Sequence, residues 1–475
     1  MNASRAKTLV NFGANLRIQP TSYYTPTNEQ EVLAILERHR GESIRVVGRM
    51  HSWSKVLDST GVVLSLEKFD QISINAENPT PTATLGAGVQ IKTALKALSR
   101  QGLTLPSLGL ITEQTIAGAT ATGTHGSGKH SLSHYLTSIR LAHFDPESGK
   151  AVIREISDGP ELEAARCSLG ALGIVLNLTI EIRSSYNVEF QLHEVKTLDD
   201  ALESESDWPL QQCYFLPWRW TYVVHQRRET AAPRTKTARL FRWYWFLTFD
   251  IGLHLVLVTT ARYLKAYKLV KTLYRHVLSR SLIQRWWIVD ESSAALIMEH
   301  ELFRHIEIEM FVPASRLADG MRLVQQLLEI AGGSSEPWES PEREALAESG
   351  LLSEIENVRG QYVHHYPICI RKILPDATHV SMASSADEPW YAISMISYVS
   401  PKDRDGFQRF AKVVTRVLGQ CLGGRPHWGK VCLLDAELAR QLYPRLSEFQ
   451  QVIRELDPER TFSNEGLKQV IPTAP

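Results

Sequence analysis

The chain has 475 residues, of which 43% are hydrophobic and 22% charged, as in a globular protein of two or three domains. Lys plus Arg and Asp plus Glu both number 52, so nothing in the net charge indicates a nucleic-acid partner, and we expect none. The five cysteines are scattered without CxxC spacing, which argues against a zinc site or a disulfide framework. We therefore expect no metal and a reducing compartment.

The first 185 residues mix predicted strands and helices in an α+β pattern. Thr27 and Gln30 are predicted to form the capping box of a helix over residues 27–39. A second helix is predicted over residues 90–100, where apolar side chains share one face. The predicted strands are residues 44–47, 61–66, 82–87 and 172–183.

A second domain is indicated by the rise in aromatic residues after about residue 208. Its predicted strands include residues 306–312 and 367–373. A Gly-Gly-Arg-Pro turn and a predicted helix over residues 435–455 follow near the end of the chain. We expect one domain over residues 1–185, a substrate or cap domain over residues 186–422, and a final segment, 423–475, that returns to the first domain.

A basic and aromatic segment at about residues 240–288 interrupts the neutral average. Residues 231–289 hold 11 Lys or Arg and a single acidic residue, Asp250. A helical wheel places Tyr263, Tyr267, Val270, Leu273, Tyr274 and Val277 opposite Arg262, Lys265, Lys268, Lys271 and Arg275. This pattern favours a helix in a membrane interface, and a helix packed on the second domain is the alternative. The uncharged run over residues 251–261 is too short to span a bilayer.

A glycine-rich loop, GATATGTHGSGKHS, covers residues 118–131. Its centre is similar to a phosphate-binding P-loop, but His130 follows Lys129 where a P-loop needs Ser or Thr to bind magnesium. A flexible surface loop is a second interpretation. The third, which we favour, is a loop of small residues that lets the backbone approach a flat cofactor.

Four further motifs accompany this loop in chain order. They are residues 46–54 (VVGRMHSWS), 105–111 (LPSLGLI), 168–175 (SLGALGIV) and 423–430 (GGRPHWGK). Together they resemble the vanillyl-alcohol oxidase superfamily of flavoproteins, and within it the sugar-1,4-lactone and alditol oxidases. The resemblance covers nearly the whole chain. It implies a two-subdomain FAD-binding domain joined to a mixed-sheet substrate domain.

The resemblance also implies which residues bind FAD. Backbone amides around the pyrophosphate are assigned to Gly48, Arg49, Met50 and Ser52. The opposite side of the cofactor is assigned to Gly118, Thr122, Gly123 and His125, and the adenine end to Ile174. The other cofactor contacts are Ser107, Gly109, Thr112, His427 and Lys430.

Two of these positions carry chemistry in the resembled enzymes. The histidine of the GxxHS motif, here His51, is bonded covalently to the flavin, which raises the flavin's reduction potential. At the position of Gly109, an alanine in related dehydrogenases shields the flavin from dioxygen. Glycine lacks that methyl group, so we expect an oxidase that releases hydrogen peroxide.

The substrate side departs from the resembled pattern. A Glu-x-Arg pair there orients the substrate, whereas this chain has Cys369 and Arg371, which share one face of a strand. A thiol with a pKa of about 8.5 does not replace a carboxylate near neutral pH. Lys430 is expected to stabilise the reduced flavin, and Ser107 and Ser397 to donate hydrogen bonds to the substrate.

The sequence therefore predicts an FAD-dependent oxidase of a sugar lactone or polyol that uses O2 and associates with the cytoplasmic face of a membrane. Two alternatives follow from Cys369 and the basic segment. One is an oxidase of a lipid-linked sugar or another membrane-borne alcohol. The other is a flavin-binding protein with weakened catalysis.

Overall fold

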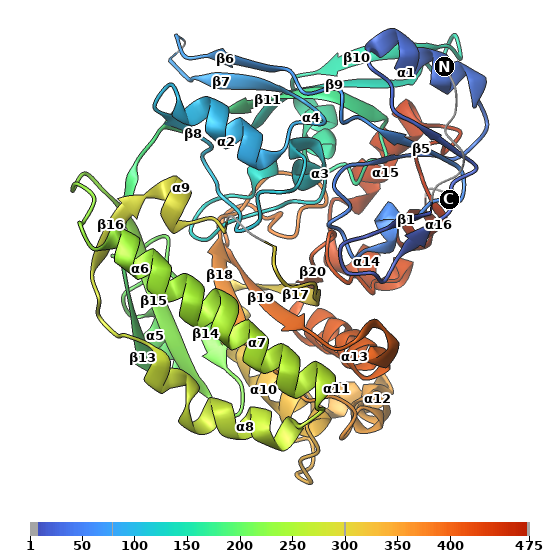
Figure 1. Ribbon diagram of the computed structural model, residues 1–475. Coiled ribbons are helices and arrows are strands. Elements are labelled where there is room, and N and C mark those ends of the chain that lie inside the picture. The colour runs from blue at the N-terminus through green and yellow to red at the C-terminus, as the bar shows by residue number, and fades with distance from the viewer. Residues whose placement is uncertain (1–7, 78, 299–300, 473–475) are drawn as a thin grey trace.

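The structure is a computed structural model that describes residues 8–77, 79–298 and 301–472. Its N-terminal part, at the top of Figure 1, contains two larger sheets besides the two-stranded pairs β1-β2 (Leu9–Val10 and Arg17–Ile18) and β12-β8 (Arg183–Ser184 and Leu103–Thr104). The parallel sheet has the order β3-β5-β4, formed by Ser22–Tyr24, Val62–Ser65 and Ile44–Val47. The antiparallel sheet has the order β10-β9-β11-β7-β6, formed by Ala151–Ile156, Leu136–Phe144, Ile174–Glu181, Thr82–Gly86 and Ile72–Asn75.

The helices of this part are α1 (Glu29–Arg38), α2 (Ile91–Ser99), α3 (Ile116–Ala121) and α4 (Gly159–Arg166). The first two agree with the predicted helices, but the capping box predicted from Thr27 and Gln30 is wrong. Asn28 is the N-cap, and its side chain accepts from the Glu31 N–H at 2.9 Å. Glu31 in turn accepts from the Thr27 N–H at 2.7 Å, so the cap lies one residue later than predicted.

An eight-stranded sheet forms the second part, with the order β16-β13-β15-β14-β18-β19-β17-β20 and antiparallel pairs. Its strands are Ile288–Glu291, Asn187–Val195, Thr221–Thr230, Gln212–Leu216, Ile368–Ile373, Trp390–Ser397, Ile306–Pro313 and Arg425–Pro426. Apolar side chains on one face pack against α10 (Leu317–Ala331) and α13 (Asp405–Leu422). The other face carries the polar residues described below and looks toward the first part.

A 26-residue helix, Ala238–Tyr263, crosses the near face of this sheet in Figure 1. It comprises α6 (Ala238–Trp245), η3 (Phe246–Leu253), α7 (His254–Leu257) and η4 (Val258–Tyr263), with π-helical turns in η3 and η4. The helix is long and apolar enough to cross a membrane, and only 17% of its most apolar window is buried. Such a helix is weak evidence for a membrane by itself.

The helix that follows, α8 (Tyr267–His276), coincides with the amphipathic segment predicted from the sequence. Its apolar side chains Val270 and Tyr274 are buried in the cluster that includes Phe241. Its basic face is also engaged, because Lys271 donates to the Gly332 carbonyl at 2.8 Å. The buried side chains of α8 thus follow the alternative interpretation, although Leu269 and Val277 are exposed, as are several apolar side chains of the helix before it.

The C-terminal segment returns to the first part through α14 (Ala436–Leu442), α15 (Leu446–Leu456) and α16 (Glu465–Val470). The Asn464 amide donates to the carbonyls of Lys55, Val56 and Asp58. The single helix predicted over residues 435–455 is interrupted at Pro444, which cannot donate a backbone hydrogen bond.

Candidate functional site

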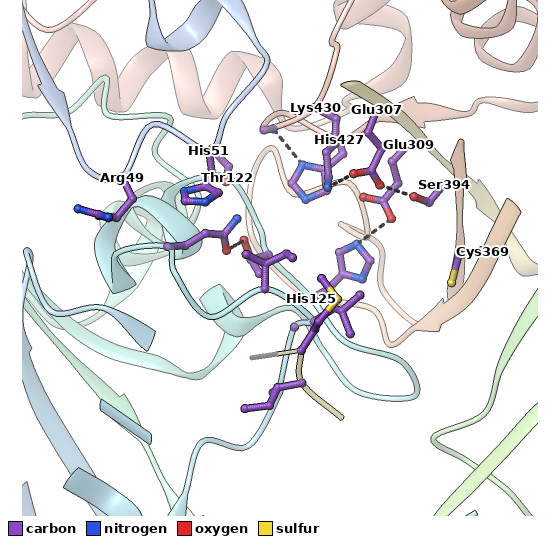
Figure 2. A pocket seen from close by; sticks show the side chains of 18 of the residues that line it. Arg49, His51, Thr122, His125, Glu307, Glu309, Cys369, Ser394, His427 and Lys430 are labelled. Atoms are coloured by element: carbon purple, nitrogen blue, oxygen red, sulfur yellow. Dashed lines mark hydrogen bonds and ion pairs between the residues drawn. The ribbon is translucent and has the colours of Figure 1, made fainter. Parts of the chain in front are cut away.

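A cavity of about 1080 Å³ lies between the first part and the eight-stranded sheet. One end is lined by loops of the first part, including residues 46–52 and 109–125. The middle is lined by the polar face of the sheet, and Figure 2 shows side chains from both sides converging there. The other end continues beneath the long helix. The cavity therefore joins every motif quoted from the sequence.

The wall formed by the first part is shaped by small residues. A Cβ at Gly48 would lie 2.4 Å from Thr115 Oγ1, and one at Gly118 would lie 3.0 Å from the same atom. Met50 follows with a φ of 55°, so β4 ends in a left-handed turn. Only glycine allows the β4 turn to approach the start of α3 this closely. The resulting groove fits a flat, phosphate-bearing cofactor such as FAD.

The buried Arg45 holds this wall together, and the sequence analysis missed it. Its guanidinium donates to the carbonyls of Val56, Leu169, Gly170 and Phe462 at 2.6–3.0 Å. One side chain thus connects β4, the 168–170 turn and the C-terminal segment. A charged residue at an interior position of a predicted strand was the available signal.

His51 lies at the edge of the cavity, as the resemblance implies (Figure 2). Its ring stacks on Phe12 with centroids 5.3 Å apart, and its Nε2 lies 2.7 Å from Glu301 Oε1. Among the described residues, no hydrogen bond reaches its Nδ1. The ring is therefore held in place while one nitrogen stays available, as a covalent bond to the flavin requires.

The P-loop interpretation of the glycine-rich loop is wrong. The loop begins in the last turn of α3 and leads to a short 3-10 turn, η2 (Leu132–Tyr135), where a P-loop would open an α-helix. Lys129 Nζ is paired with Glu229 Oε1 at 2.8 Å. His125 points from this loop into the cavity toward Glu309 (Figure 2).

The polar face of the sheet is built by strand register. Cys369 on β18 and Glu309 on β17 are both paired with Ser394 on β19, so the three lie in one row. Because side chains alternate between faces, Glu307 and Arg371 lie on the same face, each two residues from the row and on opposite sides of it. All five line the cavity. The sequence analysis identified the strand that holds both glutamates but missed their role.

Lys430 forms an ion pair with the first of these glutamates. Its Nζ lies 2.5 Å from Glu307 Oε2, and the Ser394 hydroxyl donates to the other oxygen of that carboxylate. Lys430 lines the cavity as predicted, but its charge is largely balanced by Glu307. The resemblance predicts that the positive charge of Lys430 stabilises the reduced flavin. In the structure this charge belongs to an oriented ion pair with Glu307.

Histidines surround Glu309. His125 Nε2 lies 3.5 Å from Glu309 Oε1, and His427 lines the same part of the cavity. Burial lowers the pKa of His427 to about 3, so this imidazole is neutral. Burial alone would raise the pKa of Glu309, but the neighbouring His125 and Lys430 bring it below its usual range. Glu309 is thus a buried carboxylate at neutral pH.

His125, Glu309 and His427 also place three possible metal-ligand atoms within 4.8 Å of one another. The prediction of no metal rests on the spacing of the cysteines, and this group contains none. Two imidazoles and a carboxylate are a donor set that divalent transition metals accept.

Most residues assigned from the sequence line the cavity. Those that line the cavity are Gly48, Arg49, Met50, His51, Ser52, Gly109, Gly118, Thr122, His125, Cys369, Arg371, His427 and Lys430. Ser107 lines a small adjoining cavity that Arg371 also borders. Burial raises the pKa of the Cys369 thiol, so this residue stays neutral.

Besides Ser107, four assigned residues do not line the cavity. Ile174 is buried in the core beside its lining neighbours Gly173 and Val175. Thr112 is buried, and a Cβ at Gly123 would meet Met382. The assignment of Ser397 fails because of strand alternation: Ser394 and Ile396 face the cavity, so Ser397 faces the opposite side, beside Tyr362.

Most side chains at the end of the cavity beneath the long helix are apolar, with polar ones such as His225 and Asp250 among them, and we call this end the apolar arm. Side chains from the sheet and from the helix form its walls. They are Leu192, Leu216, Val223, Phe241, Trp245, Phe249, Leu253, Leu278 and Leu282. The outer side of the same helix exposes Leu240, Trp243, Leu247 and Leu255 by 50–63%.

The groove shaped by glycines lies beside a polar cluster, between a two-sheet domain and a sheet-based cap. This arrangement is that of a flavin-dependent oxidoreductase of the vanillyl-alcohol oxidase type. A crystal structure of cholesterol oxidase from Brevibacterium sterolicum matches this fold with a TM-score of 0.73 and 14% identity, over 98% of this chain and 97% of that one. A family model for D-arabinono-1,4-lactone oxidase matches residues 178–470, and one for the FAD binding domain matches residues 20–145. The chain belongs to the D-arabinono-1,4-lactone oxidase family.

Two relatives are similar along their whole length. A long-chain alcohol oxidase from an uncultured marine euryarchaeote is 47% identical over 96% of this chain and 95% of its own. An L-gulono-1,4-lactone dehydrogenase from Mycobacterium tuberculosis is 23% identical over 95% of this chain and 96% of its own. The protein is thus an enzyme that uses FAD to oxidise CH–OH donors.

Proposed function

We propose that this enzyme oxidises the hydroxyl carbon of a membrane-borne alcohol with a long apolar chain, and that O2 accepts the electrons to give hydrogen peroxide. The observation that carries the proposal is the apolar arm, which opens directly from the polar row of Glu309, Ser394 and Cys369. A polar head can lie in that row while a hydrocarbon chain extends beneath the long helix.

The energetics favour such a substrate over a polyol. Each buried CH2 group contributes about 0.8 kcal/mol to binding in an apolar site. A sugar in the apolar arm would instead leave the hydroxyl groups that face the apolar side chains without hydrogen-bond partners, at a cost of about 1–3 kcal/mol each. The long-chain alcohol oxidase that is 47% identical supports the same choice by its name.

The residues of the chain have separate tasks in this reaction. FAD, when bound, supplies two-electron oxidation. The groove from Gly48 to Ser52 and from Gly118 to His125 would hold the cofactor. Arg371 and the Lys430–Glu307 pair provide fixed charges next to the reacting carbon, and the apolar arm excludes water from it. His51 is the proposed point of covalent attachment.

Gly109 supports the assignment of O2 as the acceptor. It lines the cavity beside His125, and a Cβ in its place would lie 3.0 Å from Thr124 Cγ2 and 3.3 Å from the His125 carbonyl oxygen. The missing methyl group leaves a narrow space next to the groove. We propose that dioxygen reaches the reduced flavin through this space.

The outer side of the long helix supports association with a membrane surface. Leu240, Trp243, Leu247 and Leu255 are exposed there, and exposed basic residues such as Lys268 and Arg280 follow in the chain. Aromatic and aliphatic side chains beside Lys and Arg are typical of a helix in the interface of an anionic membrane. The five free cysteines agree with the reducing environment on the cytoplasmic side of a membrane.

The test is flavin reduction under nitrogen, followed by admission of air. Purified protein is mixed with vesicles that contain 1-hexadecanol, or with L-gulono-1,4-lactone. We expect hexadecanol to bleach the flavin at least ten times faster than the lactone, and air to restore the colour with one hydrogen peroxide per turnover. Bleaching by neither compound would support the weakened flavin-binding protein and contradict the proposal.

A sugar lactone is the second candidate, and the polar cluster favours it. Arg371 and Ser107 border a small cavity beside the main one, which offers hydrogen bonds to further hydroxyl groups. Faster bleaching by L-gulono-1,4-lactone than by hexadecanol would establish this candidate in place of the first.

A further inference from the structure

The Glu309 carboxylate has an unused acceptor atom. Its side chain is only 2% exposed and points into the cavity (Figure 2). Within the described part of the chain, Oε1 accepts no hydrogen bond, and His125 Nε2 at 3.5 Å is its ion-pair partner. A buried carboxylate oxygen without a donor is costly, so this position is suited to receive one from a ligand.

The neighbouring carboxylate differs in this respect. Both oxygens of Glu307 are occupied, one by Lys430 Nζ at 2.5 Å and the other by the Ser394 hydroxyl. Of the two buried glutamates on β17, only Glu309 has a buried oxygen without a hydrogen-bond donor among the described residues.

The strand register explains why this matters for the reaction. Glu309, Ser394 and Cys369 form one row across β17, β19 and β18. The Glu-x-Arg pattern of the resembled enzymes places a carboxylate at the position of Cys369, whose buried thiol is neutral. The row still contains one carboxylate, that of Glu309. It lies two strands from Cys369, or about 10 Å at the usual strand spacing.

We propose that Glu309 accepts the hydrogen bond of the substrate hydroxyl and takes its proton during oxidation, while His125 holds the carboxylate in position. This inference rests on the proposed oxidation of a CH–OH group. The O–H bond breaks and its proton passes to Glu309. The C–H bond breaks and its hydride, with both electrons, passes to FAD, so the C–O bond becomes a carbonyl. Dioxygen then takes the two electrons and two protons and leaves as hydrogen peroxide.

The test separates hydrogen bonding from turnover. The probes are 2-methyl-2-hexadecanol, a tertiary alcohol that has no hydrogen on the carbinol carbon and cannot be oxidised, and its methyl ether, which has no hydroxyl donor. Their affinities for the oxidised holoenzyme are measured from the flavin absorption spectrum. Glu309→Gln should weaken binding of the alcohol on the order of tenfold and leave the ether unchanged, because a hydrogen bond to a charged group is lost.

A second measurement follows the chemical step. The rate of flavin reduction by 1-hexadecanol under nitrogen should fall about 100-fold or more in Glu309→Gln, as when a general base is removed. The solvent deuterium isotope effect on that rate should rise, because O–H cleavage becomes limiting. Equal affinity losses for alcohol and ether, or an unchanged rate, would overturn the proposal.

Glu307→Gln is the matched control on the same strand. It disturbs the pair with Lys430, so we expect alcohol and ether to bind less tightly by the same factor. Should Glu309→Gln fail to retain FAD, Glu309→Asp replaces it. We then expect a smaller loss of affinity, for the tertiary alcohol and not for the ether. Native affinity together with a native rate of flavin reduction would contradict the role of Glu309. A stoichiometric divalent metal in the purified holoenzyme, bound by His125, Glu309 and His427, would also overturn it.

These outcomes differ from those of the proposed function. If only L-gulono-1,4-lactone bleaches the flavin, the proposed substrate is wrong, and the same reduction rates with the lactone test Glu309. If nothing bleaches it, the comparison of the tertiary alcohol with its ether still reports on the hydrogen bond.

Discussion

The two ends of the cavity are built from different materials. The end beside β4 and α3 is shaped by backbone and glycine, where an added Cβ at Gly48 would collide with Thr115. The apolar arm is shaped by large side chains such as Phe241, Trp245 and Phe249, which one helix supplies. A backbone-shaped wall admits few substitutions, whereas a wall of side chains changes with each one.

This difference suits the two ends of the cavity to different ligands. A groove fixed by backbone geometry suits a cofactor that all members use, and FAD is that cofactor here. A surface made of side chains can be altered without disturbing the fold, so it suits the substrate. The Glu309 row lies between the two ends, where the oxidised carbon has to meet both.

His51→Ala should have the largest effect, and it acts at the flavin end. The proposed covalent bond would raise the reduction potential of the flavin. If removal of the bond lowers that potential by roughly 60 mV, the two-electron equilibrium shifts about 100-fold. We expect turnover of every substrate to fall by a similar factor, and the fluorescent flavin band to disappear from a denaturing gel. A band that persists in the variant would place the link at another residue.

Trp245→Ala should have the next largest effect, and it acts in the apolar arm. Loss of one large side chain removes about 2 kcal/mol of apolar contact, or roughly thirtyfold in kcat/KM for 1-hexadecanol. Activity with a short alcohol should change far less, which steady-state assays on a chain-length series would measure. Leu247→Ala, on the outer side of the same helix, is the control. A uniform loss across chain lengths would contradict an apolar arm that binds the chain.

Gly109→Ala returns to the flavin end with a smaller effect. The new methyl group would lie 3.0 Å from Thr124 Cγ2, in the space assigned to dioxygen. We expect reoxidation by O2 to slow about tenfold, equivalent to ~1.4 kcal/mol on the barrier, with a smaller change in flavin reduction. Stopped-flow mixing of reduced enzyme with air-saturated buffer measures this. Reoxidation at the native rate would mean that dioxygen enters elsewhere.

Lys268→Gln should have the smallest effect, on the outer surface beyond the apolar arm. One basic residue near an anionic membrane contributes about 1 kcal/mol, so vesicle binding should weaken roughly fivefold. Sedimentation with vesicles that contain an anionic lipid measures the change, and neutral vesicles serve as the control. Equal binding to both kinds of vesicle, before and after substitution, would contradict an electrostatic contribution.

The flavin end could be predicted from the sequence, because its motifs are local. The glycine turns after residues 47 and 117 are continuous in the chain, and they lie where expected. The polar row could not be read in the same way. Glu309 and Cys369 are distant in sequence and come into one row only through their pairing with β19, and the alternation of side chains along that strand turns Ser397 away from the cavity.

The apolar arm depended on a different kind of information. The sequence indicates an aromatic segment at residues 240–288, and the helical periodicity of the part that forms α8 predicts that its apolar side faces a membrane. That helix buries its apolar side chains against the protein, whereas the preceding helix, Ala238–Tyr263, is apolar on two sides. Periodicity identifies a buried face, and only tertiary packing tells whether protein or lipid covers it.

The partners of Arg45 set an order of events during synthesis. Its side chain contacts carbonyls at residues 56 and 169, and also at Phe462. Of these three partners the ribosome makes Phe462 last. A product truncated before residue 462 would lack one of the carbonyls that hold Arg45, and we expect its wall of the flavin groove to be less ordered.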